Sequence, residues 1–420
     1  MVRNIFIKCN ICDKIFRLRW QIGYNKAFIK TLCPNCKSQF EVLLNTESES
    51  KYCNVSLIDY DKTVADYLIE VSTEFLTKKM QIDYDQLEQN DMLTPFMRNI
   101  DIDQKRVSNI LSYANSVDEL KLNIESVFSM LNNKSSYLKQ TLQQNDFFKE
   151  CSIKMGFTNI DSDLDILMVS HQYINSMIVP TYLPNTLYNM MNNINRPIME
   201  LSKLYNLDKF LCLMADKGIY NEVNRKFSSI VSDILTIFIK IIPVYLRNDL
   251  RTVDLKELGI NTINVEEVLS FYKKCYEFIG EYSIIPIGLN NIVERKDCDN
   301  FSKKTENIYI LLNSISKYNR LNDYLIQGEK FSHLFDDTLN NIIRNSEAHV
   351  DYSFDPISQI VYFKDKQKNM NLYLIELVKE SLNIYQKSVY IWEMNYCLHK
   401  QYLIKIKKET LSIDPKLLDN

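Results

Sequence analysis

Two closely spaced cysteine pairs near the N-terminus constrain the fold of this chain more than any other feature. Cys9 and Cys12 form the first C-x2-C pair, and Cys33 and Cys36 form the second after twenty intervening residues. Each pair can give two thiolates to one tetrahedral ion, and this spacing is typical of zinc sites. Because thiolates would fill all four positions and leave none for water, we expect a structural Zn²⁺ rather than a catalytic one.

The residues around the cysteine pairs alternate between apolar and polar, as β strands do. Residues 5–8 precede the first pair and residues 40–43 follow the second. With the cysteines, these flanks resemble a zinc ribbon. The short polar stretch at residues 45–50 predicts a linker. We therefore expect a small zinc-ribbon module at residues 1–45.

Basic and aromatic residues are interleaved between the two cysteine pairs. They are Lys14, Arg17, Arg19, Lys26 and Lys30, with Phe16, Trp20, Tyr24 and Phe28. Such residues on a ribbon can contact phosphates and stack on bases. Alternatively, a module of this size needs its aromatic rings as its core and its lysines for solubility. The sequence leaves both interpretations open.

After the predicted linker, the chain is expected to be mainly α. It has only 7 glycines in 420 residues, where average usage would give roughly thirty, so few tight turns are expected. Apolar residues recur at helical spacing, for example at Val64, Leu68, Val71 and Phe75. We expect a helical middle region at residues 51–249. The long apolar segment at residues 223–246 predicts a buried helix.

The last third of the chain predicts several helices and one hairpin. The predicted helices cover residues 265–282, 301–326, 331–349 and 371–403. Residues 351–366 break the helical period around Asp355 and Pro356, which predicts a small hairpin.

Charge and the N-terminal residues give expectations about the cellular environment. The formal net charge of -3 gives no global attraction to nucleic acid or to an anionic membrane. Residues 1–8 contain no apolar signal region, and the apolar residues 230–246 include Asp233, Lys240 and Pro243. We therefore expect a cytoplasmic protein that has no membrane partner and whose close cysteine pairs bind metal.

The sequence Arg344-Asn345-Ser-Glu-Ala-His349 lies near the end of a predicted helix. It resembles the motif of the HEPN ribonuclease superfamily, in which an Arg, often followed by Asn, precedes a His by four to six residues. The resemblance implies a C-terminal HEPN-like helical bundle at residues 250–420. It also implies an RNA substrate, a homodimer with a composite site, and a role as a toxin or antiviral defence effector with an antitoxin or sensor as a possible partner.

The chemistry of RNA cleavage explains these residue types. A histidine can take the proton of the ribose 2′-OH, and Arg344 can hold the charge that develops on the phosphate. Asn345 lies one helical turn before His349 and could orient it or bind a phosphate oxygen. We therefore predict Arg344, Asn345 and His349 as the catalytic residues of a hydrolase. This chemistry requires no cofactor.

A non-catalytic interpretation of the same helix is also possible. In a helix at residues 331–349, Ile342 and Ser346 would lie on the buried stripe, and His349 would continue it. A histidine at a helix C-terminus can also cap carbonyls. The alternatives to a ribonuclease are therefore a non-catalytic HEPN-like dimerisation scaffold and a zinc-ribbon regulator that binds nucleic acid.

Overall fold

The computed structural model describes most of the chain and divides it into two compact units. The described residues are 2–59, 65–84, 93–133, 140, 144–157, 159–203, 206–247, 249–302, 307–308, 310–311, 317–325, 327–336, 339–365 and 368–411. The first unit comprises residues 1–117, 235–273 and 340–382, and the second comprises residues 118–234, 274–339 and 383–420. Each unit therefore combines segments that lie far apart in the sequence.

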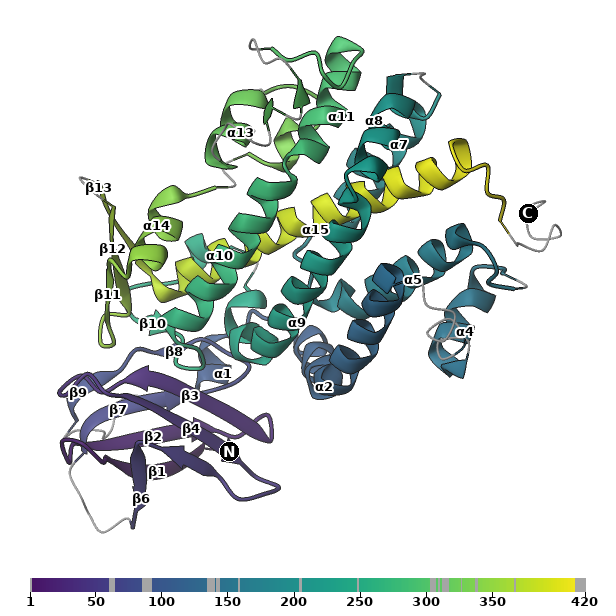
Figure 1. Cartoon of the computed structure of the whole chain (residues 1–420). Helices are drawn as coiled ribbons and strands as arrows, with labels where there is room; N and C mark the ends of the chain where they lie inside the picture. The colour runs from purple at the N-terminus through teal and green to yellow at the C-terminus, as the bar shows by residue number, and fades with distance from the viewer. Residues whose placement is uncertain are drawn as a thin grey trace. The chain divides into compact units, whose positions relative to one another are not determined.

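The described strands all belong to the first unit. They are β1 (Val2–Cys9), β2 (Ile15–Gln21), β3 (Lys26–Leu32), β4 (Gln39–Asn45), β5 (Lys51–Cys53), β6 (Val55–Ile58), β7 (Ala65–Val71), β8 (Thr77–Lys78), β9 (Gln81–Tyr84), β10 (Leu258–Gly259), β11 (Tyr352–Asp355), β12 (Ile360–Asp365) and β13 (Lys368–Tyr373). They form sheets in the orders β6-β1-β2-β7-β9, β3-β4-β5, β8-β10 and β11-β12-β13 (Figure 1).

The helical elements of the described chain include both long helices and single turns. They are α1 (Pro95–Arg98), α2 (Gln104–Asn133), α4 (Asp146–Lys154), α5 (Asp163–Ile178), η1 (Val179–Thr181), α6 (Thr186–Asn189), η2 (Met190–Asn195), α7 (Arg196–Leu201), α8 (Asn206–Asp216), α9 (Ile219–Tyr245), η3 (Leu250–Thr252), α10 (Val265–Tyr282), α11 (Ile284–Arg295), α13 (Lys317–Tyr324), η4 (Ser332–Leu334), α14 (Asn341–His349) and α15 (Leu374–Lys405).

The strands of the two N-terminal sheets share one hydrophobic core. Phe16, Leu18 and Trp20 alternate with half-buried residues along β2 and belong to this core. Phe40 contributes from β4, and its ring centroid lies 5.0 Å from that of Phe16. Because successive side chains of a strand point to opposite faces, the alternating sequence pattern produces one buried face on each sheet.

The prediction of a mainly α helical-bundle protein with a small zinc ribbon is wrong. The structure is mixed, with 55% helix and 18% strand, and its described residues form four sheets, one of them five-stranded. The cysteine-bearing residues belong to a β-rich unit that also includes residues 235–273 and 340–382. The expectation of a C-terminal HEPN-like helical bundle is part of this wrong prediction, because β11, β12 and β13 form a three-stranded sheet in the first unit.

Residues other than glycine make the tight turns that the sequence analysis discounted. Asp13, Lys37 and Asn54 have φ values of 59°, 61° and 60°. This left-handed conformation costs an ordinary residue roughly 1–2 kcal/mol, so it persists only where the surrounding contacts stabilise it. The low glycine content therefore did not limit the number of hairpins.

The strand β7 lies in a segment for which the sequence pattern predicted a helix. Leu68 and Val71 were predicted to lie on a helix, whereas they lie in β7, which pairs with β2 on one side and with β9 on the other. Val64, of the same pattern, lies outside the described residues. Residues 68–71 are all buried, and a short buried run of this kind cannot be told from a helix by its periodicity.

Residues 45–50 form a hairpin loop rather than a linker. The strands on either side of this loop, β4 and β5, pair with each other. Asn45 secures the loop through its amide, which donates to Ser50 Oγ at 3.2 Å, and through its side chain, which donates to Ser48 Oγ at 2.7 Å. The domain bounds 1–45, 51–249 and 250–420 stay a prediction.

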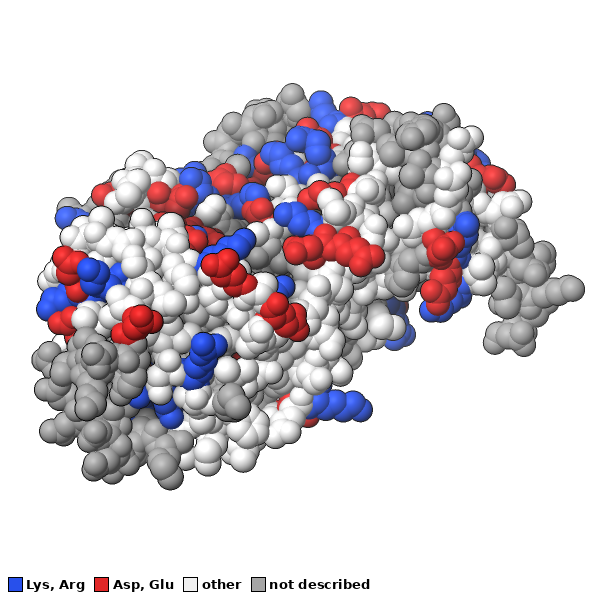
Figure 2. All heavy atoms as spheres, turned by 90° about the horizontal axis from the view of Figure 1, so that it is seen from below, with Lys and Arg blue, Asp and Glu red and all other residues white. Residues whose placement is uncertain are grey.

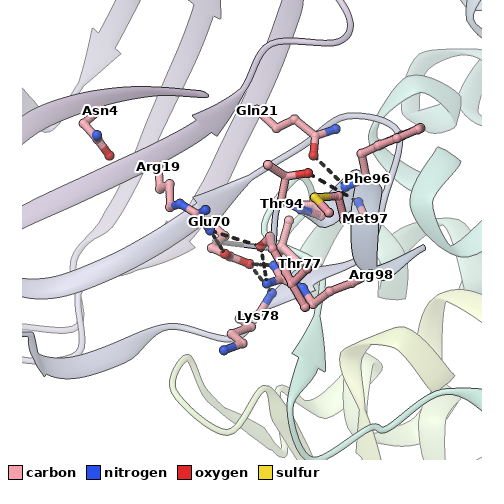
Figure 3. Close-up of polar contacts among 12 residues, drawn as sticks. Asn4, Arg19, Gln21, Glu70, Thr77, Lys78, Thr94, Phe96, Met97 and Arg98 are labelled. Atoms are coloured by element: carbon pink, nitrogen blue, oxygen red, sulfur yellow. Dashed lines mark hydrogen bonds and ion pairs between the residues drawn. The ribbon is translucent and has the colours of Figure 1, made fainter. Parts of the chain in front are cut away.

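A buried carboxylate joins β2, β7 and α1 within the first unit. Glu70 is 2% exposed, and its Oε1 lies 2.6 Å from Arg19 Nη1. Its Oε2 pairs with Arg98 and accepts the amide of Lys78 at 2.8 Å. Figure 3 shows these side chains converging on Glu70. The ion pairs thereby connect the short helix α1 to β2 and β7.

Replacing Glu70 with Gln is expected to lower the free energy of unfolding by about 3 kcal/mol. The substitution leaves the positive charges of Arg19 and Arg98 largely buried and without their carboxylate partner. Urea denaturation followed by circular dichroism measures this change. Glu41→Gln is the control, since its pair with Lys30 is largely exposed on the glutamate side and should contribute at most about 1 kcal/mol. Equal losses in the two variants would contradict the special role of Glu70.

The sheet β11-β12-β13 and the helix α14 lie side by side in the first unit (Figure 1). The predicted hairpin at residues 351–366 is extended by a third strand, β13, so that β12 lies between β11 and β13. The Gln359 side chain donates to Asn261 Oδ1 at 2.8 Å and accepts the amide of Ile260 at 2.9 Å. These bonds connect the sheet to the segment that carries β10.

The second unit is helical in its described part, with an aromatic core. His171 of α5 is buried and stacks on Tyr396 of α15 with ring centroids 3.5 Å apart. Its Nε2 lies 2.8 Å from Glu393 Oε2. A buried imidazole thus has a polar partner on one side and an aromatic ring on its face.

Helix α9 is long and apolar enough to cross a membrane by length and composition, and it is the only such helix in the described part of the chain. Its most apolar window has a mean hydropathy of 1.8, and 61% of that window is buried. A core helix of a folded protein meets the same criterion, and the sequence predicted such a buried helix at residues 223–246. The cytoplasmic location stays a prediction.

Candidate functional site

Each cysteine pair lies at the turn of a β hairpin. Cys9 is the last residue of β1, and the turn after it leads into β2. Cys33 directly follows β3, and the next turn leads into β4. Both hairpins contribute to the core described above. The folding of the two hairpins therefore brings the two pairs to one place.

The two turns have the same backbone hydrogen bonds. The amide of Asp13 donates to the carbonyl of Cys9 at 3.0 Å, and the amide of Lys37 donates to the carbonyl of Cys33 at 2.9 Å. A second bond runs from the amide of each first cysteine to the carbonyl five residues later, at 2.9 and 2.8 Å. These bonds stabilise the left-handed residues of the turns and direct both thiols of each pair to the same side.

The four thiols form one cluster. Cys9 Sγ lies 3.7 Å from Cys36 Sγ, Cys12 Sγ lies 3.6 Å from Cys33 Sγ, and all four sulfur atoms lie within 4.8 Å of one another. A tetrahedral ion with metal–sulfur bonds of about 2.3 Å requires sulfur–sulfur distances of about 3.8 Å, whereas a disulfide requires about 2.0 Å. The cluster could therefore hold one metal ion.

Burial and hydrogen bonding act differently on the four thiols. Cys9 and Cys33 are buried, whereas Cys12 and Cys36 are half-buried. The Ser38 hydroxyl lies 2.9 Å from Cys36 Sγ and lowers the pKa of that thiol, while burial raises the pKa of Cys33. A metal ion favours the thiolate form of every ligand, and would hold even the buried thiol as a thiolate.

The aromatic residues between the cysteine pairs lie mainly in the core. Phe16, Trp20 and Tyr24 are buried, and Phe28 is half-buried. The first three rings are therefore not exposed for stacking on bases. On the face shown in Figure 2, basic and acidic side chains are interspersed among the described residues. The observed burial favours the structural interpretation of these rings.

The three predicted catalytic residues all lie in α14. Arg344 and Asn345 are half-buried and His349 is exposed. Arg344 Nη1 donates to Asn345 Oδ1 at 3.1 Å, and Asn345 Nδ2 donates to Asp365 Oδ2 at 2.9 Å. The structure thus brings Arg344 and Asn345 together, and places His349 one helical turn after Asn345 at the end of the same helix.

The predicted helix at residues 331–349 and its buried stripe need correction. Asn340 caps α14 by accepting the amide of Ile342 at 2.9 Å, so the helix starts only at residue 341. Ile343 and Ser346 are its buried residues, and His349 does not continue that stripe. Its exposure leaves the imidazole accessible to a ligand in solution.

Three residues near the candidate sites were not predicted. Ser38 contacts the cysteine cluster, Asp365 at the end of β12 holds Asn345, and Lys273 of α10 pairs with Glu347 of α14 at 2.6 Å. Ser38 had a sequence signal, since it follows the second cysteine pair by two residues. The contacts of Asp365 and Lys273 depend on strand and helix packing, which the local sequence does not encode.

Comparison of the chain with protein-family models, with curated proteins and with solved structures finds no match. The resemblance of residues 344–349 to a ribonuclease motif therefore rests on the motif itself. Among the described residues, the metal-ligand cluster around Cys9 contains only the four cysteines. The two candidate sites are thus chemically separate.

Proposed function

We propose that the protein is a metal-independent endoribonuclease with a structural zinc site, and that Arg344 and His349 are its catalytic residues. The observation that carries the proposal is the arrangement on α14, where Asn345 and Asp365 hold Arg344 and an exposed His349 ends the same helix. Comparing RNA cleavage by the wild type and by His349→Ala tests it.

The zinc part of the proposal rests on the geometry of the four thiols. Zinc favours four thiolates in a tetrahedron, and the cluster offers four sulfur atoms at fitting distances. With all positions taken by protein ligands, the ion would stabilise the two hairpins and would not activate water. Zinc is therefore assigned to stability and the α14 residues to catalysis.

The proposed reaction begins with removal of a proton from a ribose 2′-OH by the His349 imidazole. The 2′ oxygen then attacks the neighbouring phosphorus, the bond from phosphorus to the 5′ oxygen breaks, and that oxygen leaves with a proton from water. The products are a 2′,3′-cyclic phosphate and a free 5′-OH. The Arg344 guanidinium donates to the non-bridging phosphate oxygens, where negative charge increases during attack.

Asn345 has a positioning role in this proposal. Its side-chain oxygen accepts from Arg344, and its amide nitrogen is held by Asp365. A fixed guanidinium loses less conformational freedom when it binds phosphate, because its side chain is already ordered. The chain from Asp365 through Asn345 thereby holds the Arg344 side chain in place.

We expect the active species to be a homodimer. The family that the motif resembles places two copies of the motif across one cleft, and a twofold axis near the end of α14 would bring the two helices together. Val350, directly after α14, is 76% exposed and apolar, as a residue at such an interface would be in the separate chain. Light scattering at micromolar concentration should give twice the chain mass. A fully active monomer would remove the composite site.

A further inference from the structure

A pocket of about 540 Å³ opens in the first unit, and none of the residues discussed above as ligands or catalysts lines it. Its walls come from the β2–β3 loop, the β7–β8 loop, α1 and the first part of α2. A pocket of this volume is in the range that binds metabolite-sized molecules. Its lining therefore indicates what kind of molecule would fit.

A buried carboxylate is the most unusual part of the lining. Glu74 is 3% exposed, and Ser72 Oγ donates to its Oε2 at 3.0 Å. The carboxyl group lies directly against Gly23, where a Cβ atom would overlap Glu74 Oε1. No Lys or Arg is among the described residues that line the pocket. The carboxyl group of Glu74 is thus held at the pocket wall without a lining cation.

The remaining walls combine aromatic and polar surface. Phe75 and Phe96 meet edge to face with ring centroids 5.7 Å apart. Ser108 and Ser112 lie one turn apart on the face of α2 that lines the pocket, together with Val107. A ligand can therefore contact apolar rings and hydroxyl groups in addition to the carboxylate.

We propose that this pocket binds a small organic cation, whose ammonium or guanidinium group pairs with Glu74 and whose apolar part contacts Phe75 and Phe96. A buried carboxylate is costly unless it is paired, and a cation would provide the partner. Aromatic faces also attract cations. An anionic ligand would be repelled by Glu74, and a neutral ligand would leave the charge unpaired.

Isothermal titration with agmatine and with phenethylamine tests the proposal, with 2-phenylethanol as the neutral counterpart. We expect saturable binding of at least one amine at one site per chain, and weaker or no binding of the alcohol. Glu74→Gln should weaken amine binding by about tenfold or more. Glu49→Gln makes the same charge change at an exposed loop position and should leave binding unchanged.

Two results would overturn the proposal. The first is the absence of saturable binding of both amines to the wild type at millimolar concentration. The second is binding of the alcohol as tightly as the amine, or binding that is unchanged in Glu74→Gln. Circular dichroism and zinc content verify that each variant is folded.

The pH dependence of amine binding gives an independent readout. Burial raises the pKa of Glu74 above its usual value, so the carboxylate should gain its proton at a higher pH than exposed carboxyl groups. The other titratable group that lines the pocket is Tyr24, whose pKa is raised by burial and by the nearby Glu47 and Glu74 carboxylates, so its phenol stays neutral over the acidic range. Binding should therefore weaken as the pH falls toward the raised pKa, and Glu74→Gln should abolish this dependence.

The same shift predicts the stability of the ligand-free protein. A carboxyl group whose folded pKa lies above its unfolded pKa stabilises the fold below the unfolded value, and this contribution is lost as the pH rises through the folded pKa. Glu74→Gln should therefore raise the melting temperature at neutral pH while it weakens amine binding. A variant that is more stable but binds less cannot owe its defect to misfolding.

Discussion

Replacing Cys33 with Ser is expected to release zinc and to unfold the β-rich first unit. Structural zinc sites contribute about 10–16 kcal/mol of binding free energy, which is comparable with the whole stability of a typical domain. Cys33 is fully buried and belongs to the core of the two N-terminal sheets. Loss of the ion would therefore remove both the link between the hairpins and part of their core.

The extent of unfolding distinguishes this structure from an independent ribbon. The amide of Lys30 in β3 donates to the carbonyl of Asn261 at 2.9 Å, and β8 pairs with β10. Unfolding of the sheets should therefore also expose residues 235–273 to protease and to hydrogen exchange, whereas an independent ribbon would leave them protected.

Elemental analysis should find one zinc ion per wild-type chain and none in Cys33→Ser. Cys53→Ser is the control, because Cys53 is exposed, lies in β5 of the same unit and is outside the cluster. It should retain zinc and stability. Wild-type protein purified without any bound zinc would refute the assignment of the metal.

The second large effect concerns RNA cleavage. His349→Ala and Arg344→Ala should each lower the cleavage rate by about a thousandfold or more, because one removes the base and the other removes the cation that stabilises the phosphate. The double variant should lose little more, since residues that act in one step are not additive. Arg344→Lys should also be inactive, because an ammonium group does not replace the planar fork of the guanidinium.

A matched histidine control keeps this prediction specific. His333 is exposed and lies in η4, away from the motif in sequence, so His333→Ala should cleave RNA at the wild-type rate.

Cleavage by the wild type should survive brief treatment with EDTA and give 2′,3′-cyclic phosphate ends. Expression of the wild type should inhibit growth, and both motif variants should relieve this. If His349→Ala cleaves as fast as the wild type, the ribonuclease assignment must be withdrawn.

Asn345→Ala separates positioning from catalysis. If Asn345 only holds Arg344 in place, its removal should reduce the rate less than removal of either catalytic residue, and mainly through weaker substrate binding. Asp365→Asn should have a similar but smaller effect, because it acts on Arg344 through Asn345. A loss as large as that of His349→Ala would instead indicate direct contact of Asn345 with the reacting phosphate.

Local sequence patterns determined several parts of this protein. The spacing of the cysteines within each pair leaves few geometries, so the four-cysteine cluster was predictable from residues 9–36 alone. The helix predicted at residues 265–282 matches α10, and the last predicted helix matches α15 to within three residues. Both helices are long, and α10 also has a clear helical period, which is the primary signal of secondary structure in a sequence.

Only the tertiary structure decided the fold class and the surroundings of each site. Strand β8 pairs with β10 across about 180 positions, Glu70 of β7 pairs with Arg19 of β2 and Arg98 of α1, and Asp365 of β12 accepts from Asn345 of α14. The periodicity of apolar residues along the sequence cannot predict such pairs. The free energy that stabilises them comes from burial and hydrogen bonding between segments that are distant in the sequence. For the same reason the buried residues of β7 were predicted to be helical from their spacing. They form an inner strand of the sheet because β2 and β9 pair with them.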